Sequence, residues 1–359
     1  MNLQRLHNIT RELIAIDSVT GNEAEIVEFM YKHLCERGMS VKLLPVDEGR
    51  KNILAAFSPQ PPKILFNTHL DTVPVQYGPH EDAQRIYGRG ACDTHGILAA
   101  QLEAIEDLHS DDVVEIGILL VVGEEATHDG ALQVGHCKSI YEPDVLIVGE
   151  PTENKLMNAQ LGRLKLELAA YGREGHSGYP QEFDSAVDKL ITVLSAIRNA
   201  DWVKDDSSEG TTVNIILKEG GHADNQIPAF AQARLMFRCA EPCELIKQKV
   251  RQLVDRVATR LGASKIGEPH FELNWGAAQN DPVSMLATIP GFETGTAAFN
   301  TDISYLGWKK CKTFLVGPGS ILNAHKDLNG GNWLQGEWIL KENQLKGVEI
   351  YKKLVKRLL

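Results

Sequence analysis

The chain is poor in paired cysteines. Its six cysteines stand at positions 35, 92, 137, 239, 243 and 311, and no two of them form a Cys-x-x-Cys motif. This scatter argues against a disulfide framework and against a thiolate zinc site, and it is typical of buried free thiols in a reducing compartment. We therefore expect a cytoplasmic protein.

Long apolar runs and runs of positive charge are also missing. No apolar segment approaches the ~20 residues of a membrane-spanning helix, and the first residues, MNLQRLHNITRELIAI, carry charges throughout and do not resemble a secretory signal. The 37 Lys and Arg residues against 48 Asp and Glu residues give a formal charge of −11. Because such a chain is repelled by phosphate backbones and anionic lipids, we expect neither a nucleic-acid partner nor a membrane partner.

Several common catalytic motifs do not occur in the sequence. There is no Gly-x-x-x-x-Gly-Lys-[Ser/Thr] loop and no Gly-x-Gly-x-x-Gly after a predicted strand, which argues against a bound nucleotide or dinucleotide. Gly-x-Ser-x-Gly is also missing, which disfavours a serine hydrolase with a nucleophile elbow.

The apolar residues that are present predict two domains. They make up 43% of 359 residues, enough for a sizeable core, and this excludes a disordered chain. Outside the middle of the chain, apolar runs alternate with helical patterns, which predicts an α/β domain with a mostly parallel sheet. The predicted helices include 3–17, 22–37 and 97–108, and the predicted strands are 53–57, 64–66, 113–122, 145–148 and 314–316.

The middle of the chain has a different pattern. Alternating strands and amphipathic helices follow one another in the order β-α-β-β-α-β over residues 164–275. This order predicts an inserted ferredoxin-like domain that interrupts the larger domain, which is formed by 1–163 together with 276–359.

Candidate ligands and acid–base groups follow the ends of four apolar runs. Ligands in open α/β sheets bind beyond the carboxyl ends of the strands, so we expect these groups to meet there. They are His69 with Asp71, Glu124 with Glu125, Glu150, and His325. A further carboxylate, Asp93, precedes the predicted helix at 97–108. Each residue alone has an ordinary structural interpretation, since a single histidine is commonly hydrogen-bonded in a core and Asp93 could cap a helix.

Together these groups predict a metal centre. So many carboxylates in one crevice need compensating positive charge, and two imidazoles with several carboxylates suit Zn²⁺, with Co²⁺ or Mn²⁺ as alternatives. The side chains of the adjacent Glu124 and Glu125 diverge, so one can bind metal while the other acts as a general base on a water molecule. This combination indicates a hydrolase.

Five ordered motifs resemble those of one family of dinuclear zinc hydrolases. The family includes acetylornithine deacetylase, succinyl-diaminopimelate desuccinylase, aminoacylase and the glutamate-releasing carboxypeptidases. The similarity covers nearly the whole chain, and the segment 317–326 is most similar to acetylornithine deacetylase. The motifs are 67–74 (NTHLDTVP), 88–93 (GRGACD), 123–125 (GEE), 149–152 (GEPT), and 317–319 (GPG) followed by His325.

The resemblance assigns a role to each metal-site residue. It implies that one metal is bound by His69 and Glu150 and that the other is bound by Glu125 and His325. Asp93 would bridge both metals. Asp71 would orient a ligand, and Glu124 would be the general base. The family usually has Asp-x-Lys-Gly after the bridging aspartate, whereas this chain has Asp93-Thr94-His95-Gly96. His95 could therefore add a pH-sensitive group beside the metals or simply cap a helix.

The resemblance also implies that the inserted domain is a lid and dimerisation domain. His176 would stabilise the oxyanion, donated by the partner subunit of a homodimer, and Asn225 and Arg238 would hold the substrate. The implied reaction is hydrolysis of the amide bond of an N-acyl-L-amino acid, and N-acetylornithine is the leading candidate substrate. The alternatives are a short-peptide metallopeptidase or carboxypeptidase, and a metal-retaining binding protein without catalysis.

Overall fold

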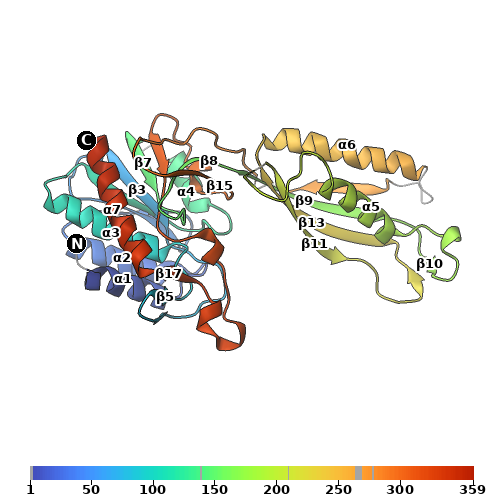
Figure 1. The fold of residues 1–359 in the computed structure, drawn as a ribbon, viewed down its shortest axis with the longest axis horizontal. Helices are drawn as coiled ribbons and strands as arrows, with labels where there is room; N and C mark the ends of the chain where they lie inside the picture. Colours follow the sequence, from blue (N-terminus) through green and yellow to red (C-terminus); the bar gives the residue numbers. More distant parts are fainter. Residues whose placement is uncertain (1–2, 138–139, 209, 263–268, 277–278) are drawn as a thin grey trace. The chain divides into compact units, whose positions relative to one another are not determined.

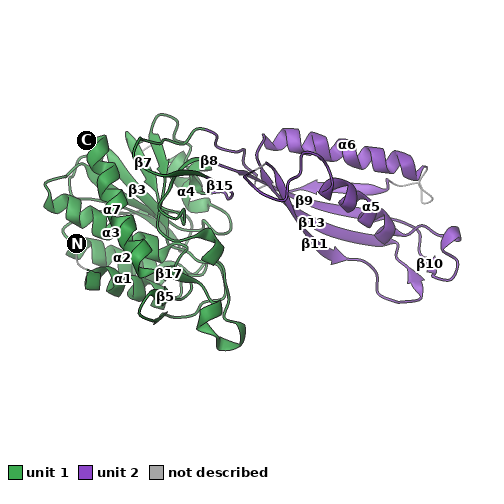
Figure 2. Cartoon of the chain, viewed as in Figure 1, with its two compact units in different colours: residues 1–158, 285–295, 301–359 green, residues 159–284, 296–300 purple. Residues whose placement is uncertain are grey.

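The computed structural model describes residues 3–137, 140–208, 210–262, 269–276 and 279–359. The chain forms two compact units, shown in different colours in Figure 2. Unit 1 comprises Met1–Asn158, Met285–Gly295 and Thr301–Leu359, and unit 2 comprises Ala159–Ser284 and Thr296–Asn300.

Unit 1 contains an eight-stranded sheet. Four central strands, β6, β3, β7 and β16, are parallel, and the pairs β1–β2, β2–β6 and β16–β8 are antiparallel. In order across the sheet the strands are β1 (Ser40–Pro45), β2 (Lys51–Ala56), β6 (Ile116–Val121), β3 (Ile64–His69), β7 (Val145–Val148), β16 (Lys312–Leu315), β8 (Leu156–Gln160) and β15 (Thr294–Ala297).

The α/β class is confirmed, but the expected mostly parallel sheet is wrong, because the sheet is mixed. The chain turns back between β1 and β2 through a short loop, in which Val46 N–H donates to the Arg50 carbonyl, so these strands must be antiparallel. Strand β1 is largely exposed at the sheet edge and therefore lacks the apolar run by which the central strands were recognised.

Helices pack with this sheet into one hydrophobic core, and α3 and α7 lie side by side (Figure 1). Helix α3 is buried over most of its length, which explains why apolar residues are so frequent in the helix predicted at 97–108. The helices of unit 1 are α1 (Leu3–Ala15), α2 (Ala24–Glu36), α3 (His95–Ser110), α4 (Asp129–His136) and α7 (Lys341–Leu358).

Short elements complete unit 1. A three-stranded sheet has the order β17 (Trp338–Leu340), β5 (Arg85–Tyr87), β4 (His80–Glu81). Single 3₁₀ turns are η2 (Asp302–Ser304), η3 (Ile321–Asn323), η4 (Asn329–Gly331) and η5 (Trp333–Gln335).

Unit 2 has the predicted element order β-α-β-β-α-β. Its antiparallel four-stranded sheet has the order β11 (Thr212–Glu219), β13 (Phe230–Cys239), β9 (Gly162–Tyr171), β14 (Phe271–Trp275). Alternate residues of β9 and β13 are buried, and helices α5 (Ala186–Arg198) and α6 (Cys243–Leu261) pack on that buried face (Figure 1). Ser185 is the N-cap residue of helix α5, and its hydroxyl accepts a hydrogen bond from Asp188 N–H at 3.2 Å. A separate two-stranded sheet pairs β10 (Gly175–His176) with β12 (Gln226–Ile227), and η1 (Pro180–Glu182) follows β10.

Unit 2 is longer at both ends than the predicted inserted domain of 164–275. Gln160 pairs with Val283 and Arg163 pairs with Asn280, so the flanking segments belong to this unit. The side chain of Asn280 also donates to Asn300 Oδ1 at 2.6 Å, which attaches residues 296–300.

All six cysteines are free thiols, as expected. Three of them are buried (Cys92, Cys239 and Cys243), whereas Cys137 and Cys311 are partly buried and Cys35 is exposed. Among the described residues, no helix combines the length and the apolar character that crossing a membrane would require.

Candidate metal centre

The candidate ligands lie where the parallel strands end. His69 is the last residue of β3, Glu124 and Glu125 follow β6, and Glu150 follows β7. Because β6, β3 and β7 are parallel neighbours, their carboxyl ends share one edge of the sheet. The local sequence thus brings side chains from distant parts of the chain to one place.

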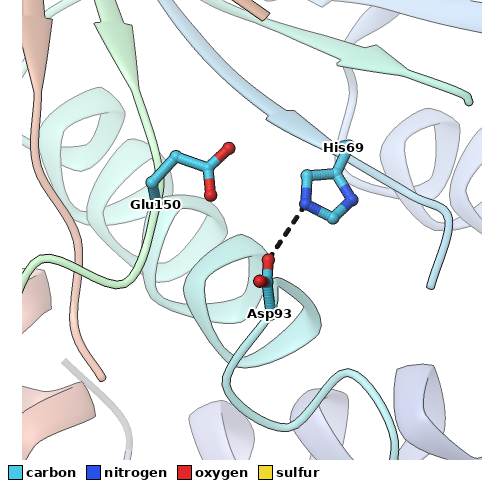
Figure 3. A group of neighbouring side chains, drawn as sticks. All are labelled: His69, Asp93 and Glu150. Carbon is cyan, nitrogen blue, oxygen red and sulfur yellow. Dashed lines mark hydrogen bonds and ion pairs between the residues drawn. The ribbon is translucent and has the colours of Figure 1, made fainter. Parts of the chain in front are cut away.

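One ligand group consists of His69, Asp93 and Glu150, all buried. Their ligand atoms lie within 4.8 Å of one another. His69 Nε2 is 3.1 Å from Asp93 Oδ1, and Figure 3 shows the three side chains turned toward one another.

A second group consists of Asp93, Glu125 and His325, again within 4.8 Å. His325 Nε2 is 3.1 Å from Glu125 Oε1 and 3.4 Å from Asp93 Oδ2. The two oxygens of Asp93 therefore face different imidazoles, Oδ1 toward His69 and Oδ2 toward His325. This is the arrangement expected of a carboxylate shared by two metal ions.

The electrostatics of these groups fit bound cations. Burial, and then the charge of Asp93, raises the pKa of Glu150 well above its usual value and also raises that of Glu125. Hydrogen bonds to Asp93 and Glu125 raise the pKa of His325 to about 10. Buried carboxylates that disfavour one another's charge are stabilised by divalent ions, and the nitrogen and oxygen donors without thiolate suit Zn²⁺, Co²⁺ or Mn²⁺. The residues present therefore fit the predicted pair of metal ions.

Asp71 supports the site in a way that the sequence did not predict. The main-chain carbonyl of Asp71 is 2.8 Å from His69 Nδ1, whereas its carboxylate is farther away, at 3.6 Å. The carboxylate also accepts hydrogen bonds from the backbone N–H groups of Glu124 and Glu125, at 3.0 and 3.1 Å, and from the Thr20 hydroxyl at 2.7 Å. Asp71 thus holds the backbone that carries both glutamates.

His95 is a buried structural residue at the start of α3. Its Nε2 lies 3.1 Å from the Leu70 carbonyl and 3.3 Å from the Ser18 hydroxyl. Burial lowers the pKa of His95 to about 4, so the imidazole is neutral near pH 7. Thr94 and not His95 is the N-cap residue of α3, so the capping interpretation is wrong, and the His95 ring contacts the Leu70 carbonyl and the Ser18 hydroxyl instead.

Sequence reasoning missed Glu337, which supports Asp93. The carboxylate of Glu337 is fully buried, and its Oε1 accepts from the backbone N–H groups of Cys92 and Asp93 at 2.9 and 3.0 Å. Its Oε2 accepts from the buried Arg89 at 2.9 Å, and Arg89 also pairs with Asp327, two residues after His325. Glu337 lies 244 residues from Asp93 in the chain, and no motif relates the two.

Sequence reasoning also missed His128 and Asp302, which form a buried group with Glu124. The only available signal was the spacing of four residues between Glu124 and His128, which places both side chains on one side of a helical turn. Asp302 comes from the distant turn η2 and carries no such signal.

The predicted residues of the inserted domain all lie in unit 2. His176 is exposed, its neighbour Ser177 donates from N–H to the Asn225 carbonyl at 3.0 Å, and β10 pairs with β12, so the segments of His176 and Asn225 adjoin. Arg238 stands near the other end of β13. Its neighbours Phe237 and Cys239 are fully buried, and Arg238 is half-buried on the opposite face, as the strand pattern predicted.

Comparisons with known proteins identify the family. The model of peptidase family M20/M25/M40 matches residues 65–262. A peptidase M20 domain-containing protein of Schizosaccharomyces pombe is 33% identical over 361 residues, covering 99% of this chain and 84% of the relative. A probable carboxypeptidase of Aspergillus fumigatus is 30% identical over 373 residues, covering 91% and 82%. The crystal structure of a tripeptidase from Staphylococcus aureus aligns with a TM-score of 0.78 at 20% identity, covering 99% of each chain.

The chain belongs to peptidase family M20/M25/M40. Together with the two ligand groups at the strand ends, this membership makes it a metallohydrolase of the peptidase type.

Proposed function

We propose that this member of peptidase family M20/M25/M40 hydrolyses the amide bond of N-acyl-L-amino acids with two divalent metal ions, and that N-acetylornithine is the first substrate to test. One observation carries the metal-dependent part of the proposal: two ligand groups share the carboxylate of Asp93, and the buried Glu124 stands next to the ligand Glu125.

In this proposal one ion is held by His69 and Glu150, the other by Glu125 and His325, and Asp93 contacts both. When bound, the ions supply Lewis acidity, which activates water at neutral pH and polarises the substrate carbonyl. Zinc suits this ligand set, and cobalt or manganese are the alternatives.

Glu124 is the general base in this proposal. Burial, and then the charge of Asp302, raises the pKa of Glu124 well above its usual value, which gives the carboxylate a high proton affinity. Its carboxylate takes the proton of the attacking water and returns it to the nitrogen of the leaving amine. The hydrogen bonds from Glu124 and Glu125 N–H to Asp71 hold this carboxylate in place.

We also propose roles for three residues of unit 2. Gly178 N–H donates to Nδ1 of His176 at 3.1 Å, which leaves Nε2 as the protonated nitrogen of a neutral imidazole. An exposed Nε2–H is suited to stabilise an oxyanion. We assign Arg238 to the substrate carboxylate and Asn225 to substrate binding, because charged guanidinium groups bind carboxylates in pairs of hydrogen bonds.

The second candidate is a carboxypeptidase or dipeptidase acting on short peptides. The names of relatives favour it, since the Aspergillus fumigatus relative is a probable carboxypeptidase and the Staphylococcus aureus structure is that of a tripeptidase. Both candidates use the same metal centre and differ in the group on the acyl side of the scissile bond.

A substrate panel separates the two candidates. The zinc-loaded protein is assayed in parallel with N-acetylornithine, other N-acetyl amino acids, N-succinyl-diaminopimelate and dipeptides. Our proposal expects the highest kcat/KM for an N-acetyl amino acid, whereas preference for dipeptides would support the peptidase. Activity should disappear with EDTA and return with zinc or cobalt. Failure of the fully metal-loaded protein across the whole panel would instead favour a binding protein.

The Glu124→Gln variant tests the assignment of the general base. It should retain both metal ions and lose about 10²- to 10⁴-fold in kcat. Near-normal turnover of this variant with both ions bound would contradict the assignment.

We further propose a homodimer formed through unit 2, with His176 donated to the partner's site. Mixing His176→Ala subunits with Glu124→Gln subunits should restore part of the activity, because one site of the heterodimer would then be intact. Heterodimers that form without any recovery would contradict donation between subunits.

A further inference from the structure

Glu124 contacts a second buried pair of residues besides its metal-site neighbours. His128 Nδ1 lies 2.9 Å from Asp302 Oδ1 and 3.6 Å from Glu124 Oε1. His128 and Asp302 are each 2% exposed and Glu124 is 8% exposed, so the whole group is buried. Both atoms that face Nδ1 are carboxylate oxygens, which accept hydrogen bonds, so Nδ1 carries the proton and donates to Asp302.

The backbone around His128 is fixed by its own hydrogen bonds. The N–H groups of Thr127 and His128 both donate to the Gly123 carbonyl, at 3.1 and 2.7 Å, which closes the turn that follows β6. His128 stands in the left-handed region, with φ 55°, and immediately precedes α4. This closed turn places His128 on the same side as Glu124.

The turn that carries Asp302 is also held by local contacts, and one of its residues packs on the His128 ring. The Thr301 hydroxyl accepts from Ile303 N–H at 3.3 Å, and the Tyr305 ring stacks on the His128 ring with centroids 4.0 Å apart and planes within 12°. Gly135 of α4 allows this approach, because a Cβ there would stand 2.8 Å from the Tyr305 carbonyl oxygen. The imidazole is therefore confined both by its hydrogen bond and by its neighbours.

We propose that Asp302 and His128 are positioning residues for Glu124. The Nδ1–H of His128 donates its hydrogen bond to Asp302 and also faces the Glu124 carboxylate across 3.6 Å, and this longer electrostatic contact favours the orientation needed for proton transfer. This inference rests on the proposed role of Glu124 as the general base. His128 reaches neither ligand group of the metal centre, so its effect on turnover passes through Glu124 and leaves the metal ligands in place.

Two substitutions at His128 separate positioning from packing. His128→Leu removes the Nδ1–H and should lower kcat by about 10- to 100-fold, the range found when a supporting hydrogen-bond partner is lost. His128→Asn places an amide N–H near the position of Nδ1 and should remain within about threefold of the wild-type kcat. In both variants KM and the content of two metal ions should be unchanged. His33→Asn, a buried histidine on α2, is the matched control and should leave kcat unchanged.

Combining substitutions shows whether the effect passes through Glu124. In a Glu124→Gln background, adding His128→Leu should change the residual kcat by less than about twofold, because the positioned group is already gone. A second full loss of activity would overturn the inference, as would equal losses in His128→Leu and His128→Asn, or loss of metal from either variant.

NMR examines the hydrogen bond of the His128 Nδ1–H without any assay of turnover. In metal-free protein with ¹⁵N-labelled histidine, His128 should give an Nδ1–H resonance that exchanges slowly with water, is missing in His128→Asn and shifts in Asp302→Asn. Absence of a protected resonance from His128 would overturn the inference. Normal turnover in Glu124→Gln would overturn the proposed function and this inference together. Normal turnover in His128→Leu, with Glu124→Gln inactive, would overturn this inference alone.

Discussion

The buried pair of Arg89 and Glu337 offers a sharp test of how the protein holds Asp93. In Glu337→Gln, the amide oxygen can still accept from Cys92 and Asp93 N–H, but the amide nitrogen then faces Arg89. Arg89 is 1% exposed and loses its buried counter-charge. The wild type should be measured at pH 8, because burial and then Asp93 raise the pKa of Glu337 to about 7.

The expected loss of unfolding free energy depends on the contacts that Arg89 keeps in the variant. Breaking a buried ion pair by removing one partner costs about 3–5 kcal/mol. Arg89 keeps its contact with Asp327, whose side chain is 64% exposed, so we expect the lower end of that range, about 3 kcal/mol of unfolding free energy. Because Glu337 orients the loop that carries Asp93, metal affinity should also fall about 10- to 100-fold.

A double-mutant cycle measures how much of this loss of stability comes from the Arg89–Glu337 ion pair. Urea unfolding of the metal-free protein is measured for wild type, Glu337→Gln, Arg89→Met and the double variant. In the Arg89→Met background, Glu337→Gln should cost about 1 kcal/mol or less, which gives a coupling of about 2 kcal/mol. A coupling near zero, or a single-variant cost below about 1 kcal/mol, would refute the reasoning.

Three other changes have distinct expected outcomes. Burial, followed by Arg37 and Arg5, lowers the pKa of His33 from 6.5 to about 4, so the unfolded chain takes up its proton first as the pH falls. His33 should therefore cost about 3 kcal/mol of stability between pH 6.5 and 4, and urea unfolding of His33→Leu should lack this part of the pH dependence. Asp71→Ala leaves two backbone N–H groups without their acceptor and should lower the unfolding free energy by about 2–6 kcal/mol; a loss below about 1 kcal/mol in urea unfolding would contradict this. Thr20→Val removes the third donor to that carboxylate and should cost about 1 kcal/mol in the same assay, whereas an unchanged midpoint would contradict the contact.

The central part of the fold and the ligand groups could be anticipated from the sequence. The strands that lead to His69, Glu125 and Glu150 contain continuous apolar runs, and parallel strands place their carboxyl ends at one edge. Local pattern and general topology are therefore sufficient to bring those residues together. The inserted β-α-β-β-α-β order was equally visible, because strands β9 and β13 alternate buried residues with half-buried ones.

Residues that support the site through long-range contacts could not be anticipated. Glu337 and Asp302 act by meeting partners from distant segments, and each in isolation has the pattern of an ordinary surface or core residue. Arg89 stands in the motif 88–93, but its partner Glu337 is 248 residues away in the chain. The edge strand β1 was missed for a related reason, since Lys42 interrupts its apolar residues and its pairing depends on a hairpin. Such features depend on tertiary packing rather than local pattern.

The most direct test of the metal centre is an anomalous difference map from a crystal of the zinc-loaded protein. We predict two peaks, one on each side of the Asp93 carboxylate: the first beside His69 and Glu150, the second beside Glu125 and His325. A single peak, or none in contact with Asp93, would contradict a dinuclear site.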